Sequence, residues 1–143
     1  MLTFMDEKCV FCEIASGRSE GHVVASNAHC VAFLDAAPIN AGHTLVVPRK
    51  HLRDIHGLDA ATSAAMFDLA RRVADSLRDS TLPCEGVNLL MSNGEVAEQS
   101  VFHAHLHVIP RVENDGFAFV EPPAARPTAD ELAATARLLR PGR

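Results

Sequence analysis

The amino-acid sequence predicts an α+β fold in which about five antiparallel strands form one sheet, with helices packed on one face of it. Five short β-type segments are separated by turns and short loops, and one long segment between the third and the fourth has the apolar periodicity of a helix. Strands joined by such short connections favour antiparallel pairing, and a sheet of this kind buries one face under helices.

The length and charge of the chain fit one domain. Its 143 residues are 48% hydrophobic, which is enough for a single core. The net charge of −5 speaks against a nucleic-acid polymer as partner, because such a partner requires clustered Lys and Arg. No apolar run approaches the roughly 20 residues that span a bilayer, and residues 1–8 lack the apolar core of a signal peptide. We therefore expect a cytoplasmic protein without a membrane partner.

The first three strands are predicted at residues 22–25, 30–34 and 43–47, the last of them closed by Pro48. The loop 35–42 joins the second to the third and is marked by Pro and Gly. A helix is predicted over residues 59–78 because its apolar residues recur at a spacing of three to four. These residues are Ala65, Met66, Leu69, Val73 and Leu77.

Two further strands are predicted at residues 87–91 and 101–109, separated by a turn at 92–95. Thr128 and Glu131 have the spacing of a capping box, which predicts a short helix up to Leu139. We expect one domain over residues 1–143, with a core at about 9–111 and a Pro-rich loop and C-terminal helix within 112–143.

Three of the eight histidines alternate with apolar residues in the last predicted strand. Because side chains alternate along a strand, His103, His105 and His107 are predicted to share one face. Three imidazoles on one face suit a catalytic zinc site, or nucleophilic and acid–base chemistry on a phosphate. The remaining interpretation is an exposed edge strand whose polar positions happen to be histidine. The opposite face, predicted to pack on the helix, consists of Phe102, Ala104, Leu106 and Val108.

Residues 99–109 resemble the signature of the histidine-triad (HIT) family, in which three histidines alternate with apolar residues. Cys-x-Phe-Cys at 9–12, Phe-Leu-Asp at 33–35 and the segment 42–51 also match the family in order and spacing. The resemblance covers about residues 9–111 and points to the bacterial HIT-like or histidine-triad nucleotide-binding branch. It implies a HIT-like fold that dimerises.

The resemblance implies a hydrolase or transferase that acts at the α-phosphate of purine nucleotides such as AMP or GMP derivatives. Nucleoside 5′-phosphoramidates or acyl-adenylates would be hydrolysed to release AMP. His105 would attack the phosphorus and form a covalent nucleotidyl-histidine, while His107 would hydrogen-bond the phosphate. Ser100 and Gln99 match polar residues near the phosphate and the leaving group. His103 and His107 are both candidates for protonating the leaving group.

The resemblance also implies a nucleotide pocket. Asp35 matches the acid that binds the ribose, although it also suits the role of a turn cap before Pro38. Asn93 lies in a turn that borders the ribose or phosphate in relatives, and its alternative role is that of a plain Asn-Gly turn. The nucleobase pocket would be lined by Val10, Phe11, Ile14, Phe33, Ala36 and His43.

Cys9 and Cys12 form a C-x-x-C pair, which by itself fits either a metal site or a thiol–disulfide couple. In many bacterial relatives such a pair binds structural zinc with two histidines, which match His51 and His103 here. A Cys2His2 set is closed, so this zinc would be structural, and it would leave leaving-group protonation to His107 or to the substrate. With no GxxxxGK loop and no carboxylate cluster, no magnesium requirement is expected.

Several functions stay open at this point. Glu98 lies where relatives usually have a small residue near the phosphate, and its carboxylate would repel an anionic substrate unless it points outward. The alternatives to the phosphoramidate hydrolase are a dinucleoside polyphosphate hydrolase and a nucleotide-binding regulatory module with little turnover. A zinc-dependent hydrolase with the triad as ligands is a further class.

Overall fold

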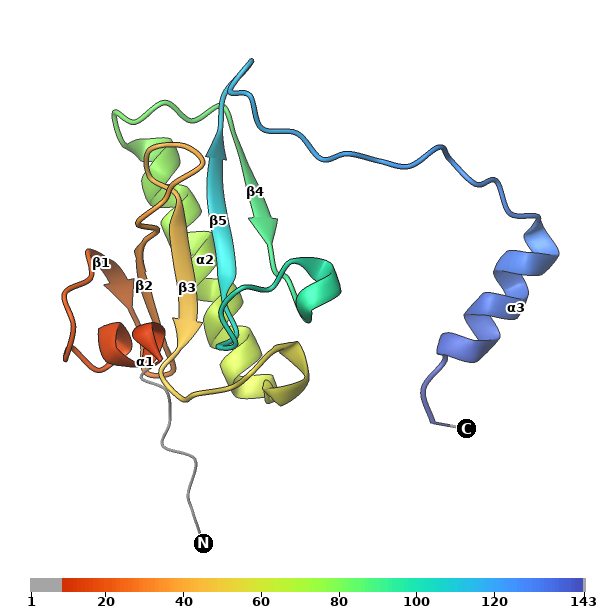
Figure 1. Cartoon of the computed structure of the whole chain (residues 1–143), viewed down its shortest axis with the longest axis horizontal. Helices are drawn as coiled ribbons and strands as arrows, with labels where there is room; N and C mark the ends of the chain where they lie inside the picture. The colour runs from red at the N-terminus through yellow and green to blue at the C-terminus, as the bar shows by residue number, and fades with distance from the viewer. Residues whose placement is uncertain (1–8, 143) are drawn as a thin grey trace, which may run out of the picture.

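Five antiparallel strands form one sheet in the order β1-β2-β3-β5-β4 (Figure 1). The computed structural model describes residues 9–142, so the prediction for residues 1–8 lies outside it. The strands are β1 (Val23–Ser26), β2 (Cys30–Leu34), β3 (Thr44–Pro48), β4 (Gly86–Leu90) and β5 (Leu106–Arg111). The α+β fold class and the five strands are confirmed, with each of the first four strands within one or two residues of its expected bounds.

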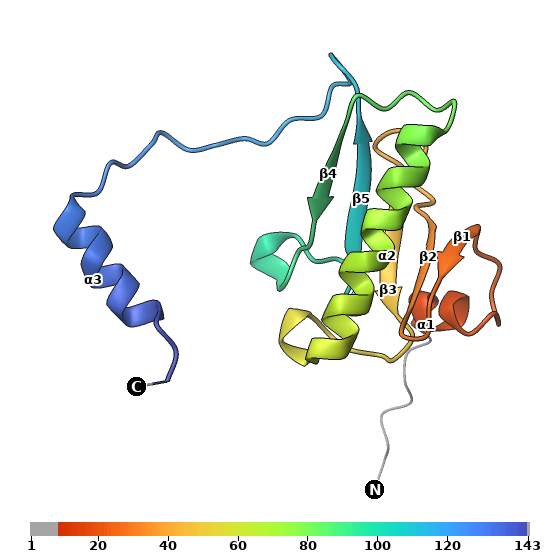
Figure 2. The same cartoon turned by 180° about the vertical axis from the view of Figure 1, so that it is seen from behind.

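The helix α2 (Ala60–Asp79) lies along one face of the sheet (Figure 2). The Asp59 side chain begins it by accepting a hydrogen bond from the Thr62 N–H at 2.7 Å. Its buried stripe packs against the side chains that β2, β3 and β5 direct to this face, which confirms the periodicity argument. The cluster contains Cys30, Ala32, Val46, Met66, Leu69, Ala70, Val73, Leu77 and Val108.

A second helix, α1 (Val10–Ala15), covers part of the opposite face, in front of the sheet in Figure 1. Its six residues are too short to show a helical period, so the sequence did not predict it. Phe11 and Ala15 pack against the alternate side chains of β2 and β3, because successive strand residues point to opposite faces. These partners are Val31, Phe33, Leu45 and Val47.

The prediction of a strand over 101–109 is wrong in its first half, because β5 begins at Leu106 and residues 101–105 are irregular. The Ala104 N–H donates to the Leu52 carbonyl at 2.6 Å, and the pairing of β5 with β3 begins only at Leu106 opposite Val46. Phe102 lies against the Arg53 guanidinium, whose Cζ is 4.2 Å from the ring centroid. The three histidines therefore do not share one strand face.

The C-terminal helix α3 (Ala129–Leu139) begins with the expected capping box of Thr128 and Glu131. Figures 1 and 2 show it standing away from the sheet at the end of an extended segment. Its apolar side chains Leu132, Leu138 and Leu139 are 56%, 87% and 76% exposed. Two short 3-10 helices complete the chain, η1 (Ile55–Gly57) and η2 (Glu95–Ala97). Within residues 9–142, no helix has the length and apolar character needed to cross a membrane.

Candidate active site and metal centre

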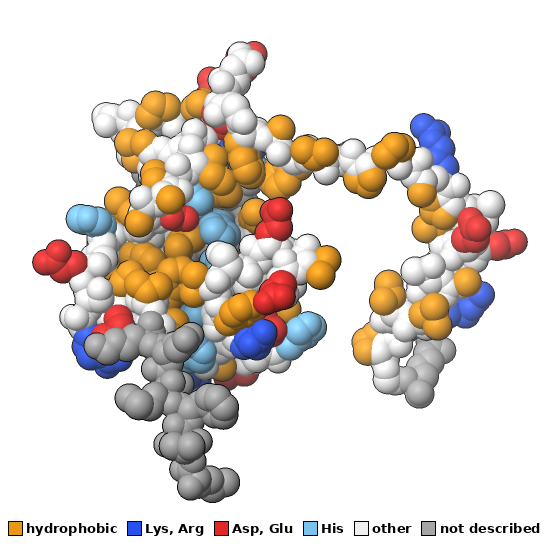
Figure 3. Space-filling model, viewed as in Figure 1, with side chains coloured by type: hydrophobic (Ala, Val, Ile, Leu, Met, Phe, Trp, Pro, Cys, Tyr) orange, Lys and Arg blue, Asp and Glu red, His pale blue; other side chains and the backbone are white. Residues whose placement is uncertain are grey.

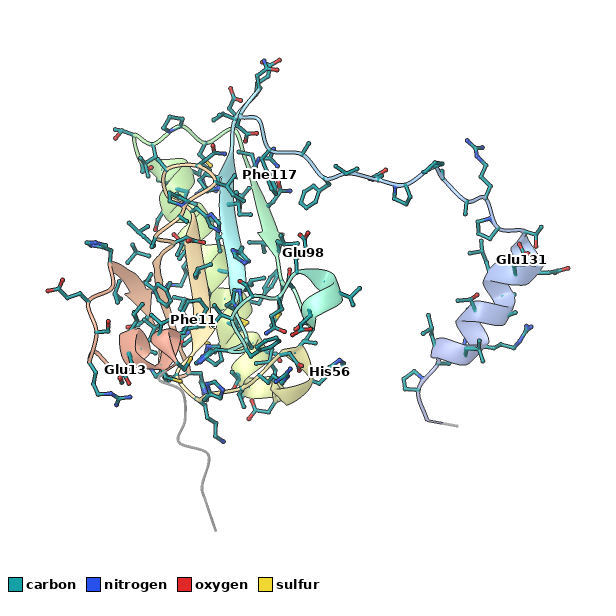
Figure 4. The ribbon with its side chains drawn as sticks, viewed as in Figure 1. Phe11, Glu13, His56, Glu98, Phe117 and Glu131 are labelled. Carbon is teal, nitrogen blue, oxygen red and sulfur yellow. The ribbon has the colours of Figure 1, made fainter. Side chains whose placement is uncertain are left out.

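A cavity of about 290 Å³ opens on the sheet face that carries α1. Figure 3 shows apolar side chains gathered beside histidines on this face, and Figure 4 labels Phe11 in front of the sheet. Nine residues predicted from the sequence line the cavity: Val10, Phe11, Ile14, Phe33, Asp35, Ala36, Ser100, His105 and His107. Leu34, Leu45 and Val101 also line it and were missed, although strand alternation places Leu45 on the same face as Phe33.

The apolar part of the cavity is built from aromatic rings held edge to face. The Phe11 ring lies 5.5 Å from the Phe33 ring and 5.2 Å from the His105 ring, centroid to centroid. Such a wall suits a planar apolar group, since aromatic faces and edges attract each other at these distances. The apolar wall therefore lies directly beside one of the triad histidines.

The orientation of His105 is set by the backbone two residues earlier. Its Nδ1 lies 2.7 Å from the His103 carbonyl oxygen. A carbonyl only accepts hydrogen bonds, so Nδ1 carries the proton and donates it. In the neutral ring, the lone pair is then on the other nitrogen, Nε2. A neutral imidazole with a defined lone pair is the form that acts as a nucleophile.

His43 is buried at 3% exposure and lies behind His107, whereas the sequence predicted it in the base pocket. The Ile39 N–H donates to His43 Nδ1 at 3.1 Å, so the proton of neutral His43 is on Nε2. This Nε2 lies 2.9 Å from His107 Nδ1 and 3.5 Å from an Asp35 oxygen. Donation from His43 makes His107 Nδ1 an acceptor, so neutral His107 carries its proton on Nε2.

Both members of this pair are neutral at pH 7. Burial lowers the pKa of His43, and the Asp35 carboxylate only partly opposes that shift. Burial, followed by the charges of His105 and His43, lowers the pKa of His107 to about 4. His107 is therefore a hydrogen-bond donor through Nε2 rather than an acid.

We expect the free energy of unfolding to fall as the pH drops from about 6.5 to about 4.5. Histidine in the unfolded chain binds a proton near pH 6.5, whereas folded His107 binds one only near a pKa of about 4. The unfolded state therefore holds more protons in this window, and acid favours it. Thermal melts across the window measure the effect. His107→Gln cannot titrate there and should show a shallower slope of Tm against pH; an equal slope would contradict the lowered pKa.

Gln99 and Asn93 do not line the cavity, because their side chains hold the loop between β4 and β5. The Gln99 amide accepts from the Gly94 N–H at 2.8 Å and donates to the Arg53 and Val101 carbonyls at 2.7 and 3.1 Å. Asn93 accepts from the Ile55 N–H at 2.7 Å. This loop leads into Ser100, which does line the cavity. Their structural contribution is thus to position Ser100.

Glu98 is exposed on the same loop, where Figure 4 labels it. Its backbone is left-handed, with φ of 67°, and it ends η2 by donating its N–H to the Glu95 carbonyl at 2.9 Å. A left-handed conformation costs a residue other than glycine about 1–2 kcal/mol. The Glu98 side chain does not line the cavity.

Cys9, Cys12, His51 and His103 bring four potential metal ligands within 4.8 Å of one another. The His103 Nδ1 lies 3.4 Å from both thiols, and the His51 Nδ1 lies 3.2 Å from Cys12 Sγ. Tetrahedral zinc holds such atoms about 3.3–3.8 Å apart. The His103 Nε2 donates to the Pro48 carbonyl at 2.8 Å, so its Nδ1 lone pair faces the thiols. These residues fit a zinc ion.

The three triad histidines belong to two different clusters of side chains. His103 is fully buried and faces the thiols, while His107 pairs with His43. Among residues 9–142 the triad forms no joint group of metal ligands, and the second potential group is Asp35, His43 and His107. In this second group, His43 and His107 lie close together because they share a hydrogen bond. This arrangement speaks against a zinc-dependent hydrolase with the triad as ligands.

Comparisons with known proteins found both similar sequences and similar folds. A model of the HIT domain matches residues 16–114. An uncharacterised HIT-like protein of Mycoplasma genitalium is 40% identical over 112 residues, which cover 78% of this chain and 79% of that protein. The crystal structure of a HIT family protein from Bacillus anthracis has a TM-score of 0.86 and 36% identity, covering 94% of this chain and 96% of that chain.

Three other similar proteins have names that bear on chemistry. The adenosine 5′-monophosphoramidase of Schizosaccharomyces pombe is 36% identical over 103 residues, covering 72% of this chain and 74% of that protein. The adenylylsulfatase of Arabidopsis thaliana is 32% identical over 111 residues, covering 78% of this chain and 56% of that protein. A zinc-bound histidine triad family protein from Mycobacterium smegmatis has a TM-score of 0.74 and 36% identity, covering 92% of this chain and 95% of that chain.

Proposed function

The chain belongs to the histidine-triad (HIT) family, and we propose that it is a nucleotide hydrolase or transferase acting at the α-phosphate of purine nucleotides. Its substrates are nucleoside 5′-phosphoramidates or acyl-adenylates, from which it releases AMP. The observation that supports this most is the His105 ring, whose Nδ1–H is held by the His103 carbonyl beside a cavity that also contains Asp35 and His107. Similar proteins named as an adenosine 5′-monophosphoramidase and an adenylylsulfatase support the same chemistry.

In the proposed reaction, the His105 Nε2 lone pair attacks the α-phosphorus and forms a phosphorus–nitrogen bond. The bond from phosphorus to the leaving group breaks, and the leaving group departs with the electron pair. Water then attacks the phosphorus of the nucleotidyl-histidine, the phosphorus–nitrogen bond breaks with its electron pair returning to Nε2, and AMP leaves while a proton passes to the solvent. His107 donates its Nε2–H to a phosphate oxygen. The lowered pKa of His107 favours the substrate over His107 as the source of the leaving group's proton.

Asp35 and the apolar wall are proposed to bind the nucleoside. One Asp35 oxygen accepts from the Ala37 N–H at 2.9 Å, so the carboxylate caps the turn as well as facing the cavity. Its orientation is therefore fixed before a ribose binds. Phe11 and Phe33 offer apolar surface for a purine ring, with Ser100 on the phosphate side.

Zinc at Cys9, Cys12, His51 and His103 is proposed as a structural ion, supported by the fit of the ligand atoms and by the zinc-bound relative. When bound, it supplies four bonds that join α1 to residues 51 and 103. We also propose a cytoplasmic homodimer. The uncovered leucines of α3 support association, and the four cysteines, which form no disulfide with one another, suit a reducing compartment.

Adenosine 5′-phosphoramidate should be hydrolysed to AMP by the purified protein. Chromatography measures AMP release, with diadenosine polyphosphates as competing substrates and calorimetry with AMP as the binding control. Faster turnover of the diadenosine compounds would favour the dinucleoside polyphosphate hydrolase instead. Binding of AMP without turnover of either compound would leave the nucleotide-binding regulatory module.

A further inference from the structure

The loop between β2 and β3 carries both Asp35 and His43, and its own backbone orients the His43 ring. The Asp35 N–H donates to the His43 carbonyl at 2.9 Å and closes the loop. Within it, the Ile39 N–H donates to His43 Nδ1 at 3.1 Å, and the His43 N–H donates to the Asn40 carbonyl at 3.0 Å. The position of His43 therefore depends on the positions of residues 39 and 40.

Asn40 ties this loop to β5 at a distance from the cavity. Its amide nitrogen donates to the Pro110 carbonyl at 2.9 Å and to an Asp115 oxygen at 2.8 Å. The pairing of β3 with β5 ends where Thr44 lies opposite Val108. The hydrogen bond from the Asn40 amide therefore adds a contact with β5 beyond the last β3–β5 pair. Its partner, Pro110, lies three residues after His107.

Asp115, the second partner of Asn40, is a rigid anion. Its side chain is 4% exposed, and Arg111 Nε and Nη2 donate to its two oxygens at 2.7 and 2.9 Å. The Arg111 guanidinium, helped by the Phe117 N–H, holds the pKa of this carboxyl well below its usual range. Arg111 also donates to the Asn88 side chain of β4 at 2.6 Å. Asn40 therefore makes a charge-assisted bond to a group fixed on two strands.

The loop is fixed on one side by its close approach to α2. Gly42 has φ of +96°, and a Cβ there would lie 2.6 Å from a Leu77 methyl carbon, so the backbone passes directly over α2. On the other side, the Asn40 amide holds the loop against β5 through its hydrogen bond to the Pro110 carbonyl. Removing the amide lets the loop shift on the side away from α2.

We propose that Asn40 is a positioning residue that keeps His43 Nε2 within hydrogen-bond reach of His107 Nδ1. By doing so it holds the proton of His107 on Nε2, where it serves as donor to the phosphate. Asn40 touches neither the cavity nor a triad ring, and acts through His43. The inference rests on the proposed function, since the donor matters only if a phosphate binds there.

Asn40→Ala should lower kcat for adenosine 5′-phosphoramidate by about ten- to a hundred-fold, the cost of a misplacement of about 1 Å. The Kd for AMP should rise by a smaller factor than kcat falls, because Asp35 keeps its own bonds inside the loop. Asn88→Ala is the matched control. It removes a side-chain amide that also contacts Arg111, but this amide does not contact the loop between β2 and β3. It should keep kcat, with a loss of Tm similar to that of Asn40→Ala.

Long-range ¹H–¹⁵N correlation spectra of the imidazoles give a readout that does not depend on turnover. The wild type and Asn88→Ala should show His107 with its proton on Nε2, and Asn40→Ala a mixture of both tautomers. A single unchanged tautomer in Asn40→Ala, or an unchanged kcat, overturns the proposal. If the wild type turns over no nucleotide, the proposed function fails, while these spectra still decide whether Asn40 positions the histidine pair.

Discussion

His105→Ala is expected to reduce AMP release by about a thousand-fold or more. The variant lacks the only group in the proposed mechanism that forms a bond to phosphorus, and losing such a nucleophile costs at least this much in enzymes with covalent intermediates. Binding of AMP should survive, because Asp35, Ser100 and His107 still line the cavity. Initial rates for the phosphoramidate and calorimetry with AMP separate the two effects.

His56→Ala is the control for this experiment. His56 is exposed, lies outside the cavity and is labelled in Figure 4, so its loss should leave the rate unchanged. Rapid acid quenching followed by mass spectrometry should place an AMP adduct on the peptide that contains residue 105 of the wild type. If His105→Ala releases AMP as fast as the wild type, the covalent mechanism is wrong.

Removal of zinc is expected to be the largest single loss of stability. Structural zinc contributes about 10–16 kcal/mol of apparent free energy in small zinc-finger peptides. Even a fraction of this, about 4 kcal/mol, lowers the Tm of a chain of this size by about 10 °C or more. We therefore expect one zinc per chain by elemental analysis, and a Tm that falls by at least about 10 °C in Cys12→Ala or after chelation.

Cys84→Ala provides the matched comparison for the metal site. Cys84 is also a thiol, but it lies outside the ligand cluster and its Sγ donates only to the Gly86 carbonyl. This variant should keep its zinc, and its Tm should stay close to that of the wild type. A protein without zinc, together with equal melting of Cys12→Ala and Cys84→Ala, would contradict the metal site.

The elements that could be predicted from the sequence are those whose pattern is long or sharply bounded. The stripe of Met66, Leu69, Val73 and Leu77 defines α2, and Pro48 closes β3. The segment 101–105 was misread because its alternation of histidine with apolar residues is the same pattern that a strand would have. Its conformation is decided by the hydrogen bond from Ala104 to Leu52, which is a tertiary contact and leaves no local signal.

The same limit explains the errors in the site. Most of the residues that the motif resemblance names line the cavity, and most of those lie inside or directly beside a matched block. The partnership of His43 with His107 joins residues 64 positions apart, and the tie of Asn40 to Asp115 joins residues 75 apart. Such pairs depend on how β2, β3 and β5 stack side by side. No spacing along the chain reveals them.

His103 makes two separate contacts, one through its imidazole ring and one through its backbone carbonyl. Its ring nitrogen faces the thiols of Cys9 and Cys12, while its backbone carbonyl oxygen accepts a hydrogen bond from His105 Nδ1–H. We therefore expect any substitution that frees the His103 ring to disturb His105, the proposed nucleophile, as well. A mutational screen that scored only turnover would classify Cys9 and Cys12 as active-site residues, although neither lines the cavity. Screens on this fold need a melting curve beside every rate to tell the two groups apart.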